Sequence, residues 1–229
     1  MDTLQKMTPE LLAQYFDHTL LRPNATRADF EALCNQSRAF RFKMVAVNPA
    51  PVPLCCELLE GTGVRVGAAI GFPLGQNTLE VKRFEALDAI ERGAEEIDYV
   101  INITRLKDGE YAFVAKEMEA VVTVCRAHRV VSKVIFENCY LTQAEKETMC
   151  KIALDVGPDF IKTSTGFGPG GAAFEDVELM LRAVRGRIAV KAAGGIRDLS
   201  TALRLIDMGV SRIGSTASVA IVEALQKAL

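Results

Sequence analysis

The sequence predicts an α/β fold, a (β/α)8 TIM barrel, because short β-prone runs alternate with helical segments along the chain. Eight such runs begin 20 to 35 residues apart, which is the length of one strand plus one crossover helix. The helical segments between them carry clear start and stop signals. The length of 229 residues also suits this fold, which typically needs about 250 residues in one domain.

The predicted strands follow one another without a gap large enough for a second domain. They are residues 16–20, 44–47, 64–70, 96–101, 131–137, 160–164, 188–193 and 212–216. An extra N-terminal helix, opening with Thr8, Pro9 and Glu10, precedes the first strand, and we expect it to plug the bottom of the barrel. No linker, low-complexity tract or charge block divides the chain, so residues 1–229 are expected to form a single barrel domain.

The helix between the fifth and sixth predicted strands illustrates the pattern. Thr142 and Glu145 have the spacing of a capping box at its start. Apolar residues three and four positions apart then form one stripe, at Met149, Ile152, Ala153 and Val156. Gly157 is expected to end this helix, as Gly93 and Gly209 end those before the fourth and eighth strands.

Composition excludes several classes of function. The chain is 49% hydrophobic and 24% charged with a net charge of −2, so it has no basic excess that would predict a nucleic-acid partner. No apolar run reaches the ~18 residues of a membrane span, and the N-terminus lacks the apolar stretch of a signal peptide. Six cysteines without a CxxC pair indicate reduced, buried thiols and a cytoplasmic location.

Two lysines close neighbouring strands of the predicted barrel. Lys162 and Lys191 each end an apolar run and are followed by small residues and glycine. Their equivalent places in adjacent repeats indicate one nucleophilic amine beside a second cation. A neighbouring positive charge lowers the pKa of an amine, so that part of it is neutral at pH 7 and can attack a carbonyl carbon.

Asp98 interrupts the apolar run of the fourth strand. An unpaired carboxylate would be costly there, so we expect it to point into the barrel and meet Lys162 and Lys191. A structural ion pair without chemistry is the alternative interpretation. Other lysines, including Lys43 and Lys133, flank the predicted elements and are expected to be solvated.

Polar residues also interrupt the first strand and end the fifth. Asp17 and Thr19 lie in the first strand, and Glu137 ends the fifth. These side chains either organise the site or belong to a hydrogen-bonded core cluster.

The loops after the last three strands are rich in glycine and form the predicted phosphate site. Its residues are Gly166, Gly194, Gly195, Gly214 and Ser215. Glycine allows backbone amides to approach a phosphate closely, and the helix after the eighth strand would direct its N-terminal dipole at the anion. Ordinary βα turns are the alternative, and Arg197 is interpreted as a solvated helix residue.

No metal or cofactor site is readable in the sequence. The two histidines, His18 and His128, are far apart, whereas a metal-dependent enzyme usually gathers several imidazole or carboxylate ligands. The GxSxG and GxxxxGK[ST] motifs are absent. These features favour cofactor-free covalent chemistry by an amine.

Residues 17–23, 71–75, 160–166 and 190–195 resemble the motifs of the deoxyribose-phosphate aldolase family, with Asp98 and Gly214 at the expected intervals. The resemblance implies a class I aldolase that cleaves 2-deoxy-D-ribose 5-phosphate into D-glyceraldehyde 3-phosphate and acetaldehyde. It also implies that Lys162 forms the imine and that Lys191 perturbs the pKa of Lys162. Asp98 would then work with Lys191 and a water in proton transfer. The residues alone leave open which lysine attacks.

Two positions depart from the pattern of many relatives. Ala46 stands where many have a cysteine, which removes a thiol that could react with aldehydes but leaves the aldol chemistry intact. Phe167 stands where some have a lysine, so backbone amides are expected to do most of the binding in this loop.

Two rival functions are compatible with the same barrel. One is another Schiff-base aldolase or transaldolase that acts on a different phosphosugar. The other is a non-catalytic phosphosugar-binding barrel, against which the paired lysines argue, because phosphate binding needs no depressed amine. The expected partners are small phosphosugar and aldehyde substrates, and a second copy of the chain in a homodimer.

Overall fold

Eight parallel strands form a closed barrel in the order in which they occur along the chain, in a computed structural model that describes residues 7–229. The strands are β1 Phe16–Leu20, β2 Met44–Val47, β3 Arg65–Ile70, β4 Glu96–Val100, β5 Val131–Ile135, β6 Phe160–Lys162, β7 Ala189–Ala193 and β8 Arg212–Ser215. The predicted TIM barrel is therefore confirmed. Several predicted strands extend one or two residues into what the structure shows to be the loops at their carboxyl ends.

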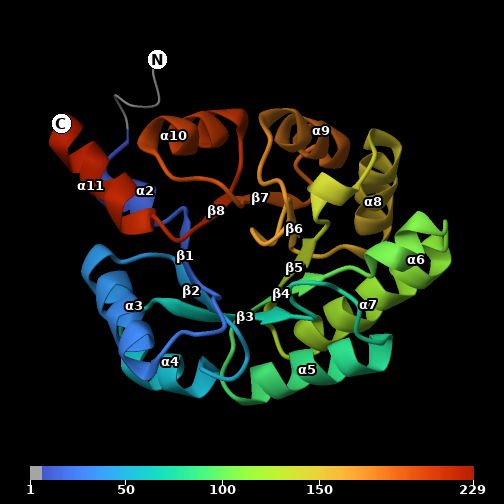
Figure 1. Cartoon of the computed structure of the whole chain (residues 1–229), viewed down its shortest axis with the longest axis horizontal. Coiled ribbons are helices and arrows are strands. Elements are labelled where there is room, and N and C mark those ends of the chain that lie inside the picture. The colour runs from blue at the N-terminus through green and yellow to red at the C-terminus, as the bar shows by residue number, and fades with distance from the viewer. Residues whose placement is uncertain (1–6) are drawn as a thin grey trace.

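Helices surround the strands in a ring (Figure 1). They are α2 Pro9–Ala13, α3 Arg27–Phe40, α4 Val52–Leu59, α5 Leu79–Glu91, α6 Ile103–Lys107, α7 Tyr111–Ala127, α8 Gln143–Val156, α9 Phe174–Val184, α10 Leu199–Met208 and α11 Ser218–Ala228, with a 3-10 turn η1 at Asn138–Tyr140. Thr142 and Glu145 form the predicted capping box, and Gly157 ends α8 in the left-handed conformation. In this described part of the chain, no helix is both long and apolar enough to cross a membrane.

The predicted extra helix is present before β1 as α2. Its main contacts are with α11, the last helix, beside which it lies in Figure 1. Leu12 and Ala13 are the buried residues of this five-residue helix. The short helix therefore packs against the last helix of the chain, and the plug at the bottom of the barrel stays a prediction.

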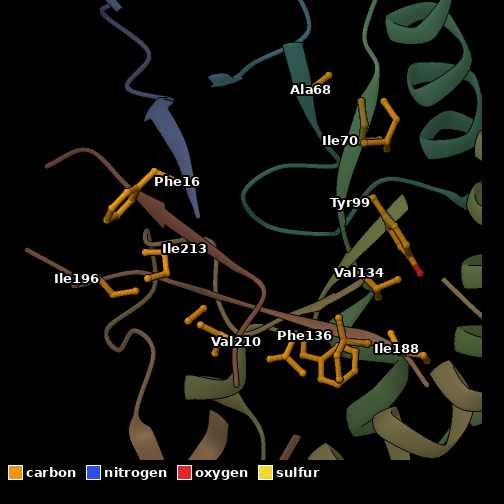
Figure 2. Close-up of a cluster of buried hydrophobic side chains, with 14 of the residues drawn as sticks. Phe16, Ala68, Ile70, Tyr99, Val134, Phe136, Ile188, Ile196, Val210 and Ile213 are labelled. Carbon is orange, nitrogen blue, oxygen red and sulfur yellow. The ribbon is translucent and has the colours of Figure 1, made fainter. Parts of the chain in front are cut away.

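Alternate residues of each strand face opposite sides of the barrel wall. One set faces the helices and forms an apolar core, part of which is drawn in Figure 2, where Phe16, Tyr99, Val134 and Ile213 are labelled. The other set faces the barrel interior. In many barrels branched apolar side chains fill this interior, but here charged residues occupy much of it, as the ion pairs of Asp98 show.

Candidate active site

Lys162 lies at the floor of a pocket at the carboxyl ends of the strands. It is the last residue of β6, and its side chain is 5% exposed. The pocket has a volume of about 260 Å³ and is lined by loops that follow β1, β6, β7 and β8. This is the end of the barrel where enzymes with this fold carry their active sites.

Lys162 and Lys191 bind the same carboxylate oxygen. The two residues are directly opposite each other on β6 and β7. Asp98, from β4, accepts a hydrogen bond from Lys162 Nζ at 2.8 Å and from Lys191 Nζ at 2.7 Å, both on Oδ2. The three residues expected to carry the chemistry are thus brought together inside the barrel, although they come from distant parts of the sequence.

These three residues belong to a larger network, which we call the buried charge cluster. It consists of Asp17, Glu96, Asp98, Lys133, Lys162, Lys191 and Arg212, all of which are buried. Asp17 bridges Lys191 and Arg212, and Glu96 bridges Arg212 and Lys133. Lys133 Nζ in turn donates to Asp98 Oδ1 at 2.7 Å. The network therefore links β1, β4, β5, β6, β7 and β8 across the interior.

The charges of this cluster do not balance when every group is ionised. Four cations face three carboxylates, which leaves one positive charge in a water-poor interior. Among the ion pairs of residues 7–229, Lys133, Lys191 and Arg212 each contact two carboxylates, whereas Lys162 contacts only Asp98. Lys162 is therefore the cation that its surroundings stabilise least.

The pKa values follow from this arrangement. Burial lowers the pKa of Lys162 to about 8; Asp98 opposes this shift, while the positive charge of Lys191 adds to it. Burial alone would raise the pKa of Asp98, but three neighbouring lysine charges outweigh burial and hold that pKa well below its usual range. A substantial part of Lys162 is consequently neutral near pH 8, while Asp98 remains a carboxylate.

Lys133 was expected to be solvated, and the structure shows that this was wrong. It is fully buried, and its position in β5 places it opposite Asp98 in β4. Burial by itself would lower its pKa, but Asp98 and Glu96 outweigh that effect and raise it. Lys133 therefore remains charged and holds Oδ1 of Asp98, which leaves Oδ2 for Lys162 and Lys191.

Asp17 and Thr19 lie on the inner side of β1, in different surroundings. Asp17 is fully buried and pairs with Lys191 and Arg212, so it belongs to the buried charge cluster. Thr19 lines the pocket, and its hydroxyl donates to the backbone carbonyl of Asp17 at 2.8 Å.

Glu137 contacts the loop after β6 rather than the lysines. It is buried and adopts the left-handed conformation, with φ of 56°, just beyond β5. Its carboxylate accepts hydrogen bonds from the backbone amide and the hydroxyl of Thr165. Thr165 Oγ1 accepts the amide of Phe167 at 3.0 Å. Glu137 thereby fixes the loop that carries Gly166.

The glycines and serine of the predicted phosphate site all line the pocket that holds Lys162. Gly166, Gly194 and Gly195 have positive φ angles, which explains why glycine is required in these loops. Ser215 uses its hydroxyl locally, donating to the carbonyl of Ile196 at 2.8 Å and accepting the amide of Ala217 at 2.9 Å.

Gly214 has a second reason for being glycine. It lies within β8 rather than in a loop, and it is paired with Asp17 of β1. A Cβ at this position would lie 3.0 Å from Cβ of Ala193 and 3.3 Å from Cε of Lys191. The absence of a side chain therefore leaves space for Lys191 inside the barrel.

Two arginines also line the pocket. Arg197, interpreted from the sequence as a solvated residue, is exposed but stands at the pocket wall. Arg22, from the loop after β1, is not among the predicted site residues, although it lies within residues 17–23, which contribute to the family resemblance. Its place at the pocket depends on the closure of the barrel between β1 and β8.

Phe167 separates the pocket from a second cavity of about 540 Å³. Phe167 is 51% exposed, and its ring packs edge-to-face on Phe72, with centroids 5.3 Å apart. Pro73, Leu74 and Ile103 give the second cavity an apolar lining. The phenyl ring supplies no charge, so any charged group from this side of the pocket must come from another loop.

No histidine or cysteine of residues 7–229 lines this pocket. His18 is buried and its Nε2 lies 2.9 Å from Oε1 of Gln36. In residues 7–229, no group of three or more histidine, cysteine or acidic side chains has an arrangement that could hold a metal ion. The six cysteines are free thiols, and four of them are buried: Cys34, Cys55, Cys125 and Cys150.

Comparison with known proteins assigns the chain to a family. Residues 11–215 match the model of the DeoC/LacD family aldolases. A protein of Bacteroides thetaiotaomicron named deoxyribose-phosphate aldolase is 54% identical over 226 residues, which cover 99% of this chain and 95% of that protein. The chain belongs to the DeoC/LacD family of aldolases. The predicted resemblance to deoxyribose-phosphate aldolases and the prediction of an enzyme are thus confirmed.

Other relatives of this aldolase agree in sequence and in structure. The deoxyribose-phosphate aldolase of Lactobacillus acidophilus is 50% identical over 96% of this chain and 93% of that protein. The solved structure of the deoxyribose phosphate aldolase from Aeropyrum pernix, described as a tetramer, has a TM-score of 0.91 and 30% identity, and the match covers 100% of this chain and 98% of that one.

Proposed function

We propose that this aldolase reversibly cleaves 2-deoxy-D-ribose 5-phosphate into D-glyceraldehyde 3-phosphate and acetaldehyde, with Lys162 as the Schiff-base nucleophile. One observation carries the choice of lysine: Lys162 contacts one carboxylate, whereas Lys191 contacts two. With a pKa of about 8 and a position at the pocket floor, Lys162 has both the reactivity and the access. No metal or other cofactor is part of this proposal.

The first step is attack on the aldehyde carbon. The neutral amine of Lys162 adds to C1 of the open-chain sugar and gives a carbinolamine, which loses water to form a protonated imine. The protonated imine carries a positive charge on the same nitrogen, beside Asp98 Oδ2, that is charged when the amine of Lys162 is protonated. The buried charge cluster is therefore prepared to stabilise it, as a preorganised site requires.

The second step is cleavage of the bond between C2 and C3. Removal of the C3 hydroxyl proton lets C3 become a carbonyl, and the electrons of the C2–C3 bond move into the iminium to form an enamine on Lys162. D-glyceraldehyde 3-phosphate leaves with C3, C4 and C5. Protonation of the enamine carbon and hydrolysis of the imine then release acetaldehyde and regenerate the amine.

Asp98 and Lys191 are suited to proton transfer near this carbon. Asp98 is held as a carboxylate by the surrounding lysine charges, and its Oδ2 already bridges both amines. A water between Asp98, Lys191 and the substrate would complete the relay that we propose. Lys191 also adds to the lowering of the pKa of Lys162.

The loops after β7 and β8 are proposed to bind the phosphate. Gly194, Gly195 and Ser215 line the same pocket as Lys162, and α11 begins close to this wall with Ser218. An anion there would interact favourably with the positive end of the helix dipole. Binding the phosphate at this distance from Lys162 would help to hold C1 next to the amine.

An aldol-cleavage assay tests the proposal against its rivals. We expect turnover of 2-deoxy-D-ribose 5-phosphate and no comparable turnover of fructose phosphates. Preference for another phosphosugar would favour the alternative aldolase or transaldolase. Binding of the sugar phosphate without any cleavage would favour a non-catalytic sensor or scaffold.

We also propose a cytoplasmic location and assembly as a homodimer. The tetramer of the Aeropyrum relative shows that a protein with this fold can self-associate. Sedimentation velocity at micromolar concentration distinguishes a dimer from a monomer or tetramer. Fractionation of cells followed by activity measurement tests the location.

A further inference from the structure

Arg22 lines the pocket that holds Lys162, from the loop after β1. We propose that Arg22 is a specificity-determining residue, which favours phosphorylated substrates by binding their phosphate from the loop after β1. The inference rests on the proposed function and adds to it a side-chain ligand for the anion.

The closed barrel places Arg22 and Arg197 on either side of the β8 loop. Strand β8 pairs with β7 on one edge and with β1 on the other. Arg197 follows β7, Arg22 follows β1, and Thr216 of the β8 loop lies between them at the same pocket. An anion above the β8 loop would therefore have one guanidinium on each side.

Contacts within its own loop hold the guanidinium of Arg22 in place. Its Nη1 donates to the backbone carbonyl of Asn24 at 2.9 Å and to Oδ1 of Asn24 at 3.1 Å, and its Nη2 lies 2.6 Å from Oδ1 of Asp29. Pro23 restricts the backbone of Arg22 to extended conformations. Because a guanidinium has five N–H donors and these contacts need at most three, Arg22 can still donate to a phosphate oxygen.

Asp29 connects this arginine to a helix. Its Oδ2 accepts hydrogen bonds from the amide and hydroxyl of Thr26, both at 2.7 Å, in the capping box that begins α3. Its other oxygen, Oδ1, binds Arg22. One carboxylate thus anchors Arg22 to the fixed end of a fourteen-residue helix, which lowers the entropy that the arginine loses when it binds a ligand.

The charges around the pocket favour an anion. Its lining contains three cations, Arg22, Lys162 and Arg197, and no carboxylate. Phe167 provides no charge from the β6 loop, so the two arginines are the cations available at the pocket wall away from Lys162. Arginine suits this task because its planar fork can bind two phosphate oxygens at once.

The test compares substrates with and without the phosphate. We expect R22Q to raise the KM for 2-deoxy-D-ribose 5-phosphate about tenfold with little change in kcat, as the loss of one charge-assisted hydrogen bond would. Cleavage of plain 2-deoxy-D-ribose should stay within twofold of the wild-type rate. Inhibition by inorganic phosphate should weaken about tenfold as well, and R22K should recover part of both losses.

R27Q is the matched control, since it removes the same charge from a residue of α3 that pairs with Glu31 and does not line the pocket. It should leave both substrates unaffected. A merely structural role of Arg22 would reduce cleavage of both substrates equally, and that result, or no change in R22Q, would overturn the inference. If the wild-type enzyme does not cleave the phosphorylated sugar, the proposed function fails instead.

Discussion

Lys162 and Lys191 face each other on adjacent strands, and both donate to the same oxygen of Asp98. Two amines that share one carboxylate oxygen cannot both be fully compensated as cations. Lys191 also contacts a second carboxylate, that of Asp17, whereas Asp98 is the only carboxylate that Lys162 contacts among the described residues. This asymmetry explains from the geometry why Lys162 is the amine that loses its proton.

The pH dependence of turnover follows from the pKa of Lys162. Because that pKa is lowered to about 8, kcat/KM for the sugar phosphate should increase as pH rises through 8, with its midpoint there, and level off at higher pH. A series of initial rates from pH 6 to pH 10 measures the midpoint. A midpoint near 10.5, the value of an ordinary lysine, would contradict the account.

Removal of Lys191 should reduce activity and shift its pH dependence. In K191M the like charge next to Lys162 is lost, so the pKa of Lys162 rises and the amine is mostly charged at pH 7. We expect kcat/KM at pH 7 to fall at least about a hundredfold, with the midpoint of the pH profile moved upward. K151M, which changes an exposed lysine of α8, is the control. Near-normal activity in K191M would refute the role assigned to it.

Removal of Lys162 should abolish turnover but stabilise the fold. The pKa of Lys162 is about 8 in the folded protein and 10.5 for an ordinary lysine, so keeping this side chain protonated costs the folded state free energy. This cost is present in full below about pH 8 and disappears above pH 10.5, where the lysine is neutral in both states. K162M should therefore gain roughly 1–3 kcal/mol in the free energy of unfolding at pH 7, and less of this gain should remain at pH 10. Urea titrations at both pH values measure it. A less stable K162M at pH 7 would show that the charges are better balanced than we infer.

Lys133 should contribute to stability in the opposite direction. K133M leaves Glu96 and Asp98 each with one cation fewer, and we expect a loss of roughly 3–5 kcal/mol in the free energy of unfolding. The double variant K133M/E96Q removes one charge of each sign and should recover part of that loss. A double variant that is no more stable than K133M would contradict the expected recovery, and adding the single variant E96Q completes the cycle that measures the coupling of Glu96 and Lys133.

The barrel could be predicted because start and stop residues of the helices mark the ends of each strand. The lysine pair could be predicted because each of the two lysines lies at the end of an apolar run. The position of Lys133 could not be read in the same way, since lysine side chains are usually solvated. Alternation in β4 does contain a signal: Ile97 and Tyr99 face the helices, so Glu96 and Asp98 must face inward and need cations. The same alternation in β5 and β8 indicates that Lys133 and Arg212 also face the interior of the barrel.

Other features depend on contacts between distant segments. The position of α2 is decided by α11, which lies at the other end of the chain. Arg22 reaches the pocket because β1 and β8 close the barrel, and because Asp29 holds its guanidinium. No local pattern of the sequence contains either relationship.

Chemical trapping tests the central claim most directly. Wild-type enzyme is treated with borohydride in the presence of acetaldehyde, digested, and examined by peptide mass spectrometry, with K162M as the control. We expect one reduced two-carbon adduct, on Lys162, and none at the corresponding position of the control. An adduct on Lys191, or no adduct at all on the active enzyme, would contradict the account.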